Sequence, residues 1–422
     1  MKKIISLIVL AVFVSTGFLI SFSSDAEAIP AFARKESAEC TLCHVGFPKL
    51  NSFGFEYKQR GYRMEGDEGP WLWDYPTMQF AGMSAFGLVW RNTNRAGTAN
   101  DATETFLTRK ELELFSGGTL APKISYFADL DFEGAGEDEG EGIVHIGRTF
   151  IILDDIMPDA MLNIKAGKYN SSLYWLSNNR KLSMEPNSYL ASQGGSMPTT
   201  NRQGLGFGAA SSDGKYQHGI EINGIFPSKT RYQVGVGNDT VATTTLSGTT
   251  TNTTNFSLKQ FYSIFDQTFD FMGEQRVGFV WVSNRIGTGS NNGSGADTTK
   301  RTHLLGGSID LEIPLGKLMP LNLMYAYFHF DDDETVGTAD YNNHIVEGIL
   351  PINDKIIITA RYDDYDLKNR KTGDRRRWLV NGHYYFAPNV DIIASYSNTK
   401  TDVSETAKME MDMFMLMFHI GF

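Results

Sequence analysis

Cysteine, positive charge and long apolar runs are all scarce in this chain of 422 residues, and each shortage excludes a class of function. The only cysteines are Cys40 and Cys43, and no histidine lies between His44 and His145, so a structural zinc site lacks nearby ligands. The formal net charge of −11 argues against nucleic-acid binding, which requires basic patches. P-loop, dinucleotide-binding and nucleophile-elbow motifs are absent, so nucleotide-dependent and hydrolase functions have no support.

The one long apolar run lies at the start of the chain. Two lysines precede the apolar stretch 4–20, and the Ala-Glu-Ala of residues 26–28 fits a cleavage site, which predicts a secretory signal peptide over residues 1–28. An uncleaved anchor is the alternative, and the polar residues before the cleavage site argue against it. No later segment offers the roughly 18 apolar residues that a spanning helix needs. The exported chain therefore either stays soluble or enters a membrane as a β-barrel.

Residues 77–422 alternate in polarity with a period of two, as strands do when their two sides face different surroundings. The final segment shows it most clearly, because Phe414, Leu416, Phe418, Ile420 and Phe422 alternate with Met413, Met415, Met417, His419 and Gly421. This pattern predicts one lipid-facing and one lumen-facing side. A soluble β-sandwich also alternates, but this many strands would need two or three sandwiches, and no linker divides them.

The expected fold is a transmembrane antiparallel β-barrel of about 16 strands, preceded by a small helical module. At roughly 20–22 residues for each strand and its connection, residues 77–422 give about 16 strands. Direct counting gives 17, which conflicts with the even number of strands in bacterial single-chain barrels. We expect the error near 203–237, where Leu205–Ala210 and Lys215–Phe226 are not two full strands, or where part of 171–202 folds inward.

Short turns and long polar loops connect the predicted strands. The short turns include Asn353-Asp354, Pro388-Asn389 and Met272-Gly273, and such turns are periplasmic in outer-membrane barrels. The long loops, expected outside the cell, include 238–254, 287–301, 331–340, 366–375 and 399–408. Acidic residues gather in 133–141 and 331–334, where they are solvated or attract a divalent cation.

The strongest chemical signal is the C-x-x-C-H motif of Cys40-Thr41-Leu42-Cys43-His44. Two thiols at this spacing can form thioethers with the two vinyl groups of one haem, and the adjacent histidine then ligates the iron. A thioredoxin-like redox pair, half of a zinc site and a short disulfide are the alternatives. The export signal favours haem, because c-type haem is attached outside the cytoplasm.

The motif sits in a longer string made of Ile29–Arg34, Cys40–His44, Pro48-x-Leu50-Asn51-x-x-Gly54 and Gly61-Tyr62. This string resembles the fused monohaem cytochrome c–porins of the bacterial outer membrane, whose best-known members oxidise Fe²⁺. The resemblance implies a cytochrome module over 29–76 and a barrel over 77–422. It implies one covalent haem c on Cys40 and Cys43, with His44 as the proximal ligand. It also implies that Asn51 and Gly54 shape the following helix and that four aromatic residues pack around the porphyrin, namely Phe32, Phe47, Phe53 and Phe55.

The sixth iron ligand is expected to be one of Met64, Met78 and Met83, the methionines that follow the motif most closely. A methionine raises the haem potential relative to a second histidine, which suits acceptance of electrons from Fe²⁺. The luminal histidines His383 and His419 are alternatives.

The resemblance implies an oxidoreductase in the outer membrane of a Gram-negative bacterium. Fe²⁺ outside the cell would be the electron donor and a periplasmic c-type cytochrome the acceptor, with outer-membrane lipid around the barrel. We expect the module inside or at one mouth of the barrel, near the cell surface. Two alternative functions would use the same haem module and barrel. One is a conduit that carries electrons outward to extracellular acceptors, and the other is a diffusion porin with a structural or regulatory haem plug. The inward-facing residues show no eyelet of clustered charges that would separate these functions.

Replacing Cys40 or Cys43 with Ala should abolish covalent attachment of haem. Haem staining after denaturing electrophoresis measures this directly. Unchanged staining in both variants would show that haem is not held by these thiols.

Overall fold

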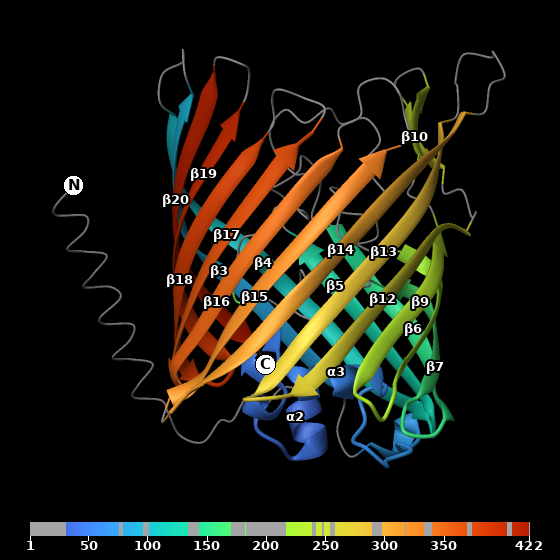
Figure 1. The fold of residues 1–422 in the computed structure, drawn as a ribbon. Helices are drawn as coiled ribbons and strands as arrows, with labels where there is room; N and C mark the ends of the chain where they lie inside the picture. The colour runs from blue at the N-terminus through green and yellow to red at the C-terminus, as the bar shows by residue number, and fades with distance from the viewer. Residues whose placement is uncertain are drawn as a thin grey trace.

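In the computed structural model of this chain, the described residues are 31–75, 79–95, 101–133, 143–169, 182, 217–238, 242–246, 249–253, 258–288, 298–316, 318–332, 340–368, 374–402 and 407–421. Sixteen strands among them form one closed antiparallel barrel (Figure 1). These strands are β3 (Phe80–Arg95), β4 (Asp101–Ala121), β5 (Ile124–Glu133), β6 (Ile143–Met157), β7 (Leu162–Tyr169), β8 (Gln217–Ile225), β9 (Thr230–Asn238), β12 (Leu258–Asp270), β13 (Glu274–Thr288), β14 (Thr298–Leu315), β15 (Leu318–Asp332), β16 (Tyr341–Asn353), β17 (Ile356–Leu367), β18 (Arg375–Ala387), β19 (Val390–Asp402) and β20 (Lys408–Gly421).

Each barrel strand pairs with the next one along the chain, and the ring closes where β20 pairs with β3. A separate hairpin of β10 (Ala242–Leu246) and β11 (Thr249–Thr253) stands out from the ring, so β9 pairs directly with β12. The prediction of about 16 strands is confirmed, and the direct count of 17 is wrong. The segment Lys215–Phe226 supplies only β8, whereas Leu205–Ala210 lies outside the described residues.

The predicted alternation between the two faces of the strands is confirmed. On β20, Phe414 is 43% exposed on the outside while Met415 and Met417 are 1% and 0% exposed inside. On β18, Trp378 and Val380 point outward, and the buried Arg377 points into the lumen. An apolar exterior around a polar interior is the arrangement of a barrel that spans a bilayer, and it excludes the β-sandwich.

The two ends of the barrel differ as predicted. Strands at one end are joined by short turns, including Asn353-Asp354 between β16 and β17 and Pro388-Asn389 between β18 and β19. The turn after β12 requires left-handed backbone at Met272 and Gly273 (φ 55° and 114°), a conformation that glycine adopts without steric cost. By the usual orientation of outer-membrane barrels, this end faces the periplasm.

A small module precedes the barrel. It contains α2 (Ala31–Glu36), the 3₁₀ turn η1 (Cys40–Leu42), the paired β1 (His44–Gly46) and β2 (Lys49–Leu50), α3 (Ser52–Gln59) and the 3₁₀ turn η2 (Leu72–Asp74). No helix among the described residues is long and apolar enough to cross a bilayer.

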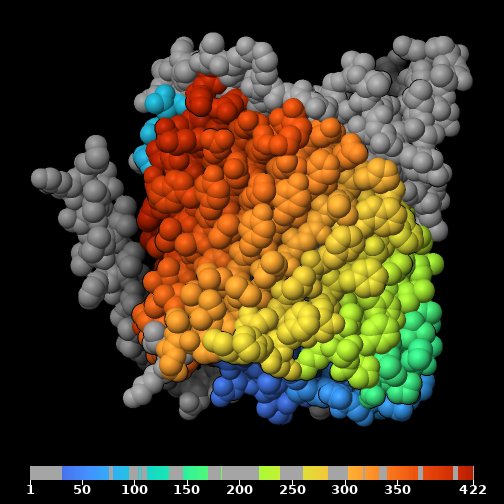
Figure 2. All heavy atoms as spheres, viewed as in Figure 1, coloured from blue at the N-terminus to red at the C-terminus, as the bar shows by residue number. Residues whose placement is uncertain are grey.

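The module lies at the short-turn mouth of the barrel, at the lower end in Figures 1 and 2. Its contacts agree: Arg34 donates to the carbonyl of Phe80 at the start of β3 (2.8 Å), and the Gln59 amide donates to the carbonyl of Gly224 near the end of β8 (2.8 Å). The expectation of a module at one mouth is met, but its placement near the cell surface is not. The reason is the short covalent connection, because only residues 75–79 separate η2 from β3, which starts at the short-turn end.

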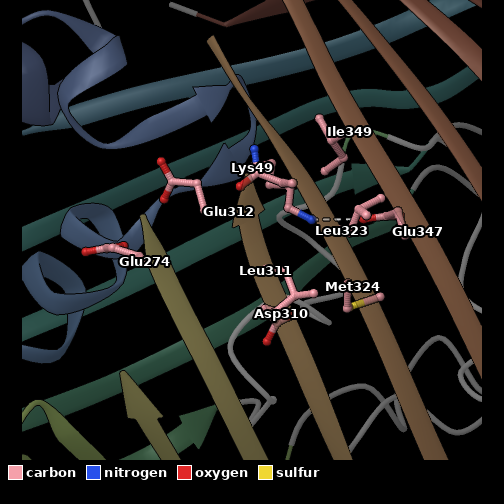
Figure 3. A pocket seen from close by; sticks show the side chains of 10 residues that line it. Lys49, Glu274, Asp310, Leu311, Glu312, Leu323, Met324, Glu347 and Ile349 are labelled. Carbon is pink, nitrogen blue, oxygen red and sulfur yellow. Dashed lines mark hydrogen bonds and ion pairs between the residues drawn. The ribbon is translucent and has the colours of Figure 1, made fainter. Parts of the chain in front are cut away.

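Buried polar contacts hold the module against the lumen wall. Lys49 reaches from β2 to Glu347 on β16, with Nζ and Oε1 2.9 Å apart and both side chains at most 5% exposed (Figure 3). On another side of the barrel, Arg63 pairs with Asp155 at 2.9 Å. Such pairs fix position well, because removal of one partner leaves a buried charge uncompensated.

Charges are clustered on the lumen wall, which corrects the sequence-based statement that no such cluster is evident. Arg361 pairs with Asp363 at 3.3 Å, and Arg377 pairs with the same carboxylate at 2.7 Å. Glu347, the partner of Lys49, lies 4.0 Å from Arg361. The sequence did not reveal this cluster because its members come from β16, β17 and β18.

One residue of the long connection between β7 and β8 is described, and it lies inside the barrel. Leu182 is 2% exposed, and its carbonyl accepts hydrogen bonds from the Asn381 amide (3.3 Å) and from Nε2 of His383 (2.8 Å). At this position the structure confirms that part of 171–202 folds inward.

Replacement of Lys49 with Met should weaken docking of the module by about 3–5 kcal/mol, because Glu347 stays buried without this cation. The measure is the rate of limited proteolysis of the module in the full-length, membrane-inserted protein. The double variant Lys49→Met/Glu347→Leu should recover much of the loss, since it removes both charges. Lys368→Met is the matched control, because the Lys368–Asp366 pair is nearly half exposed on both sides. Equal rates of proteolysis in Lys49→Met and Lys368→Met would show that the buried Lys49–Glu347 pair does not hold the module.

Candidate functional site

The C-x-x-C-H loop is built by close contact with the start of α3. The Asn51 side chain caps this helix by accepting from the Gly54 amide (2.9 Å), and its own amide donates to the carbonyl of Leu42 (3.0 Å). A Cβ at Gly54 would lie only 2.2 Å from the carbonyl oxygen of Cys43, so only glycine allows this approach. Asn51 and Gly54 thus shape the helix as expected, and they also hold Cys43 against it.

A cavity opens beside this loop, with about 830 Å³ of unfilled space, part of it open to solvent. Both cysteines, His44 and Met64 border the cavity. Its remaining walls are mostly apolar or aromatic, and the larger of these side chains are Phe32, Leu42, Phe47, Leu50, Tyr57, Tyr62 and Phe115.

Two of the four predicted aromatic residues line the cavity and two do not. Phe32 and Phe47 are wall residues, and Phe32 stacks on Tyr62 with ring centroids 4.9 Å apart. Phe55 instead points to the barrel, where the Arg231 guanidinium lies 5.4 Å from its ring, and Phe53 packs on Tyr57. Phe53 thus lies behind the cavity residue Tyr57, and contact of Phe53 or Phe55 with a porphyrin stays a prediction.

Other side chains of the cavity were missed by sequence reasoning. Phe115 comes from β4 and Tyr57 from α3, and Lys58 is the one Lys or Arg on the cavity wall. A luminal position on an alternating strand shows that Phe115 faces inward, but no local signal shows what it faces. Tyr57 follows Phe53 by about one helical turn, and this spacing is the signal that could have placed the two side chains on one face of α3.

The thiols are free and partly buried in the structure. Burial, the neighbouring Cys40 and the Glu36 carboxylate raise the pKa of Cys43 to about 11, and burial also raises the pKa of Cys40. Redox-active and zinc-binding cysteines instead work as thiolates and have lowered pKa values. Among the described residues, no group of three His, Cys, Asp or Glu side chains is arranged to hold a metal ion.

The three candidate methionines fall in different places. Met64 borders the cavity, whereas Met83 is 3% exposed in the lumen core and does not border it. Met78 lies outside the described residues. Of the two that can be placed, only Met64 shares a cavity with Cys40, Cys43 and His44.

The luminal histidines lie behind Phe47 rather than in the cavity. Phe47 packs edge-on to His44 (5.5 Å between ring centroids) and stacks on His419 (5.1 Å). Asp391 binds Nδ1 of both His383 (2.6 Å) and His419 (2.9 Å). This arrangement does not favour either histidine as an iron ligand.

Comparison with known proteins agrees with the barrel. No protein-family model and no curated protein matches the sequence. Among solved structures, the anion-selective porin from Comamonas acidovorans has a TM-score of 0.55 at 11% identity, covering 82% of this chain and 100% of its own. The outer membrane channel DcaP of Acinetobacter baumannii has a TM-score of 0.52 at 15% identity, with 81% and 97% covered. Pseudomonas putida OprB has a TM-score of 0.52 at 11% identity, with 81% and 94% covered.

The barrel has the porin fold. Each match spans nearly all of the neighbour and leaves part of this chain uncovered, a share comparable with residues 1–76. A closed, even-stranded barrel with an apolar exterior is an outer-membrane protein of a Gram-negative bacterium.

Proposed function

We propose that this chain is an outer-membrane cytochrome–porin, in which the module over 29–76 binds one haem c and transfers single electrons. The observation that carries the proposal is the aromatic cavity beside the C-x-x-C-H motif, with Met64 on its wall. The motif alone allows other readings. A cavity with a mostly apolar and aromatic lining at the same place supports haem over a thiol pair or zinc.

In this proposal, Cys40 and Cys43 would hold the haem through thioethers, and His44 and Met64 would ligate its iron. The group supplies reversible one-electron chemistry when bound. The protein tunes it, because apolar walls such as Phe32 and Phe115 exclude water and a thioether ligand raises the potential relative to a second imidazole. No proton transfer or covalent step with a substrate is needed.

The position of the module favours a periplasmic electron acceptor. The cavity lies at the short-turn mouth, where a soluble cytochrome can approach without crossing about 30 Å of hydrocarbon. Fe²⁺ is the proposed donor, on the resemblance to Fe²⁺-oxidising cytochrome–porins. It must enter from the long-loop end, through a lumen lined with carboxylates such as Asp363 and Glu347. An outward conduit would use the same path in reverse.

A second candidate is a diffusion channel with a haem plug. The solved neighbours favour it, because they include an anion-selective porin and an outer membrane channel. The buried pair Lys49–Glu347 and the partly buried pair Arg63–Asp155 weigh against it, because they hold the module in the mouth that solutes would use.

The deciding experiment is anaerobic addition of Fe²⁺ to the oxidised, purified protein, followed in the visible bands of haem. Rapid stoichiometric reduction is the expected result. Reduction by dithionite but not by Fe²⁺ would rule out Fe²⁺ as donor. Single-channel recording on the same sample should show little conductance, whereas a steady open level typical of porins would favour the diffusion channel.

Replacement of Met64 with Leu should convert low-spin haem to high-spin, because Leu keeps the volume but cannot ligate iron. Met83→Leu is the matched control and should stay low-spin, since Met83 lies outside the cavity. Visible absorption and magnetic circular dichroism distinguish the two states. A high-spin Met83→Leu with a low-spin Met64→Leu would reverse the assignment.

A further inference from the structure

The segment 65–75, called here the Trp–acid loop, joins the cavity to the outside of the molecule. It begins directly after Met64, and its sequence is Glu-Gly-Asp-Glu-Gly-Pro-Trp-Leu-Trp-Asp-Tyr. Most of its side chains are exposed, and the segment lies at the short-turn mouth beside the turn between β4 and β5. The electron transfer proposed above does not by itself explain why this loop exposes large apolar side chains.

Large apolar groups are concentrated in this loop. Trp71, Leu72 and Trp73 are 45%, 42% and 73% exposed, and Trp73 is the most exposed large apolar side chain among the described residues. The two indoles stack with centroids 4.8 Å apart. Exposed tryptophan that nothing covers marks a binding surface, because burial of its ring on a partner recovers a large apolar contact.

The loop is held in one shape before any partner arrives. The Tyr75 hydroxyl bonds the Thr119 hydroxyl (2.7 Å) and accepts from the Thr119 amide (2.9 Å), while the Thr119 hydroxyl donates to the carbonyl of Pro70 (2.6 Å). The amide of Lys123 donates to the carbonyl of Glu68 (2.9 Å). Binding therefore does not have to order the backbone, which lowers its entropic cost.

The charge of the loop has one sign. It carries four carboxylates and no Lys or Arg. Glu68 makes an exposed pair with Lys123 (3.3 Å), and the exposed Glu65 lies 3.9 Å from the partly buried Arg60. Pairs with a solvent-exposed partner are weak in water. The surface stays net negative, so it attracts a basic partner and repels an anionic lipid surface.

We propose that the Trp–acid loop is the docking surface for a small, soluble, basic electron-transfer protein on the short-turn side of the barrel. This inference rests on the proposed haem function, because Met64 ends the cavity wall where the loop begins. The indoles supply the apolar centre of the contact and the carboxylates orient the partner. Insertion of the tryptophans into lipid is the competing explanation.

The test uses the full-length haem-loaded protein in nanodiscs of zwitterionic lipid, with mitochondrial cytochrome c as a small basic probe. Binding should weaken about tenfold or more in Trp71→Ala/Trp73→Ala, the size expected for loss of an aromatic hot spot. Asp67→Asn/Asp74→Asn should weaken it less and flatten its dependence on salt. The double variant Phe271→Ala/Met272→Ala is the matched control, because these residues are 70% and 69% exposed at the turn between β12 and β13.

Two outcomes would overturn the proposed docking surface. Equal affinity of the tryptophan variant and the control variant would show that the loop does not dock the probe. Quenching of Trp73 fluorescence by brominated lipid, lost in the tryptophan variant, would assign the loop to the membrane interface. The haem spectrum separates this inference from the proposed function. A normal haem spectrum together with unchanged binding in the tryptophan variant would refute the docking surface alone. Absence of covalent haem from the protein would refute the proposed function.

Discussion

Closure of the hydrogen-bonded ring is the constraint on which the rest of the structure depends. In lipid, every strand needs a partner on both sides, so the first barrel strand must pair with the last. The β20–β3 pairing meets this need over the whole length of β20. An even number of antiparallel strands then brings the start of β3 and the end of β20 to the same mouth. A module attached just before β3 is confined to that mouth.

This confinement compensates for the small size of the module. Fewer than 50 residues bury little apolar surface by themselves. Here the barrel supplies the missing neighbours: Tyr62 stacks on Phe127 of β5, Phe47 on His419 of β20, and the Tyr385 hydroxyl donates to the Phe47 carbonyl (3.0 Å). Buried ion pairs then fix the orientation of the module. The lumen wall thus acts as part of the module's core.

The sequence predicted features that depend on local periodicity or spacing. The alternation of Phe414 with Met415, the short turns and the C-x-x-C-H loop all belong to this kind. Features that depend on which strands meet could not be predicted. The charge cluster around Arg361, the contribution of Phe115 to the cavity and the inward position of Leu182 are examples, because in each case the partners are distant along the chain. The direct count of 17 strands was too high by one, because the alternation near 203–237 does not show which segments pair.

The contribution of β4 to the cavity has a consequence for maturation. Because Phe115 forms part of the wall, residues 29–76 alone do not contain the complete site. The wall is finished only when β4 has paired with β3 and the ring has formed around the module. The haem proposed for Cys40 and Cys43 would therefore either be in place before the barrel assembles or enter afterwards through the side of the cavity that is open to solvent. Barrel assembly would thus decide by which route this group reaches the two thiols.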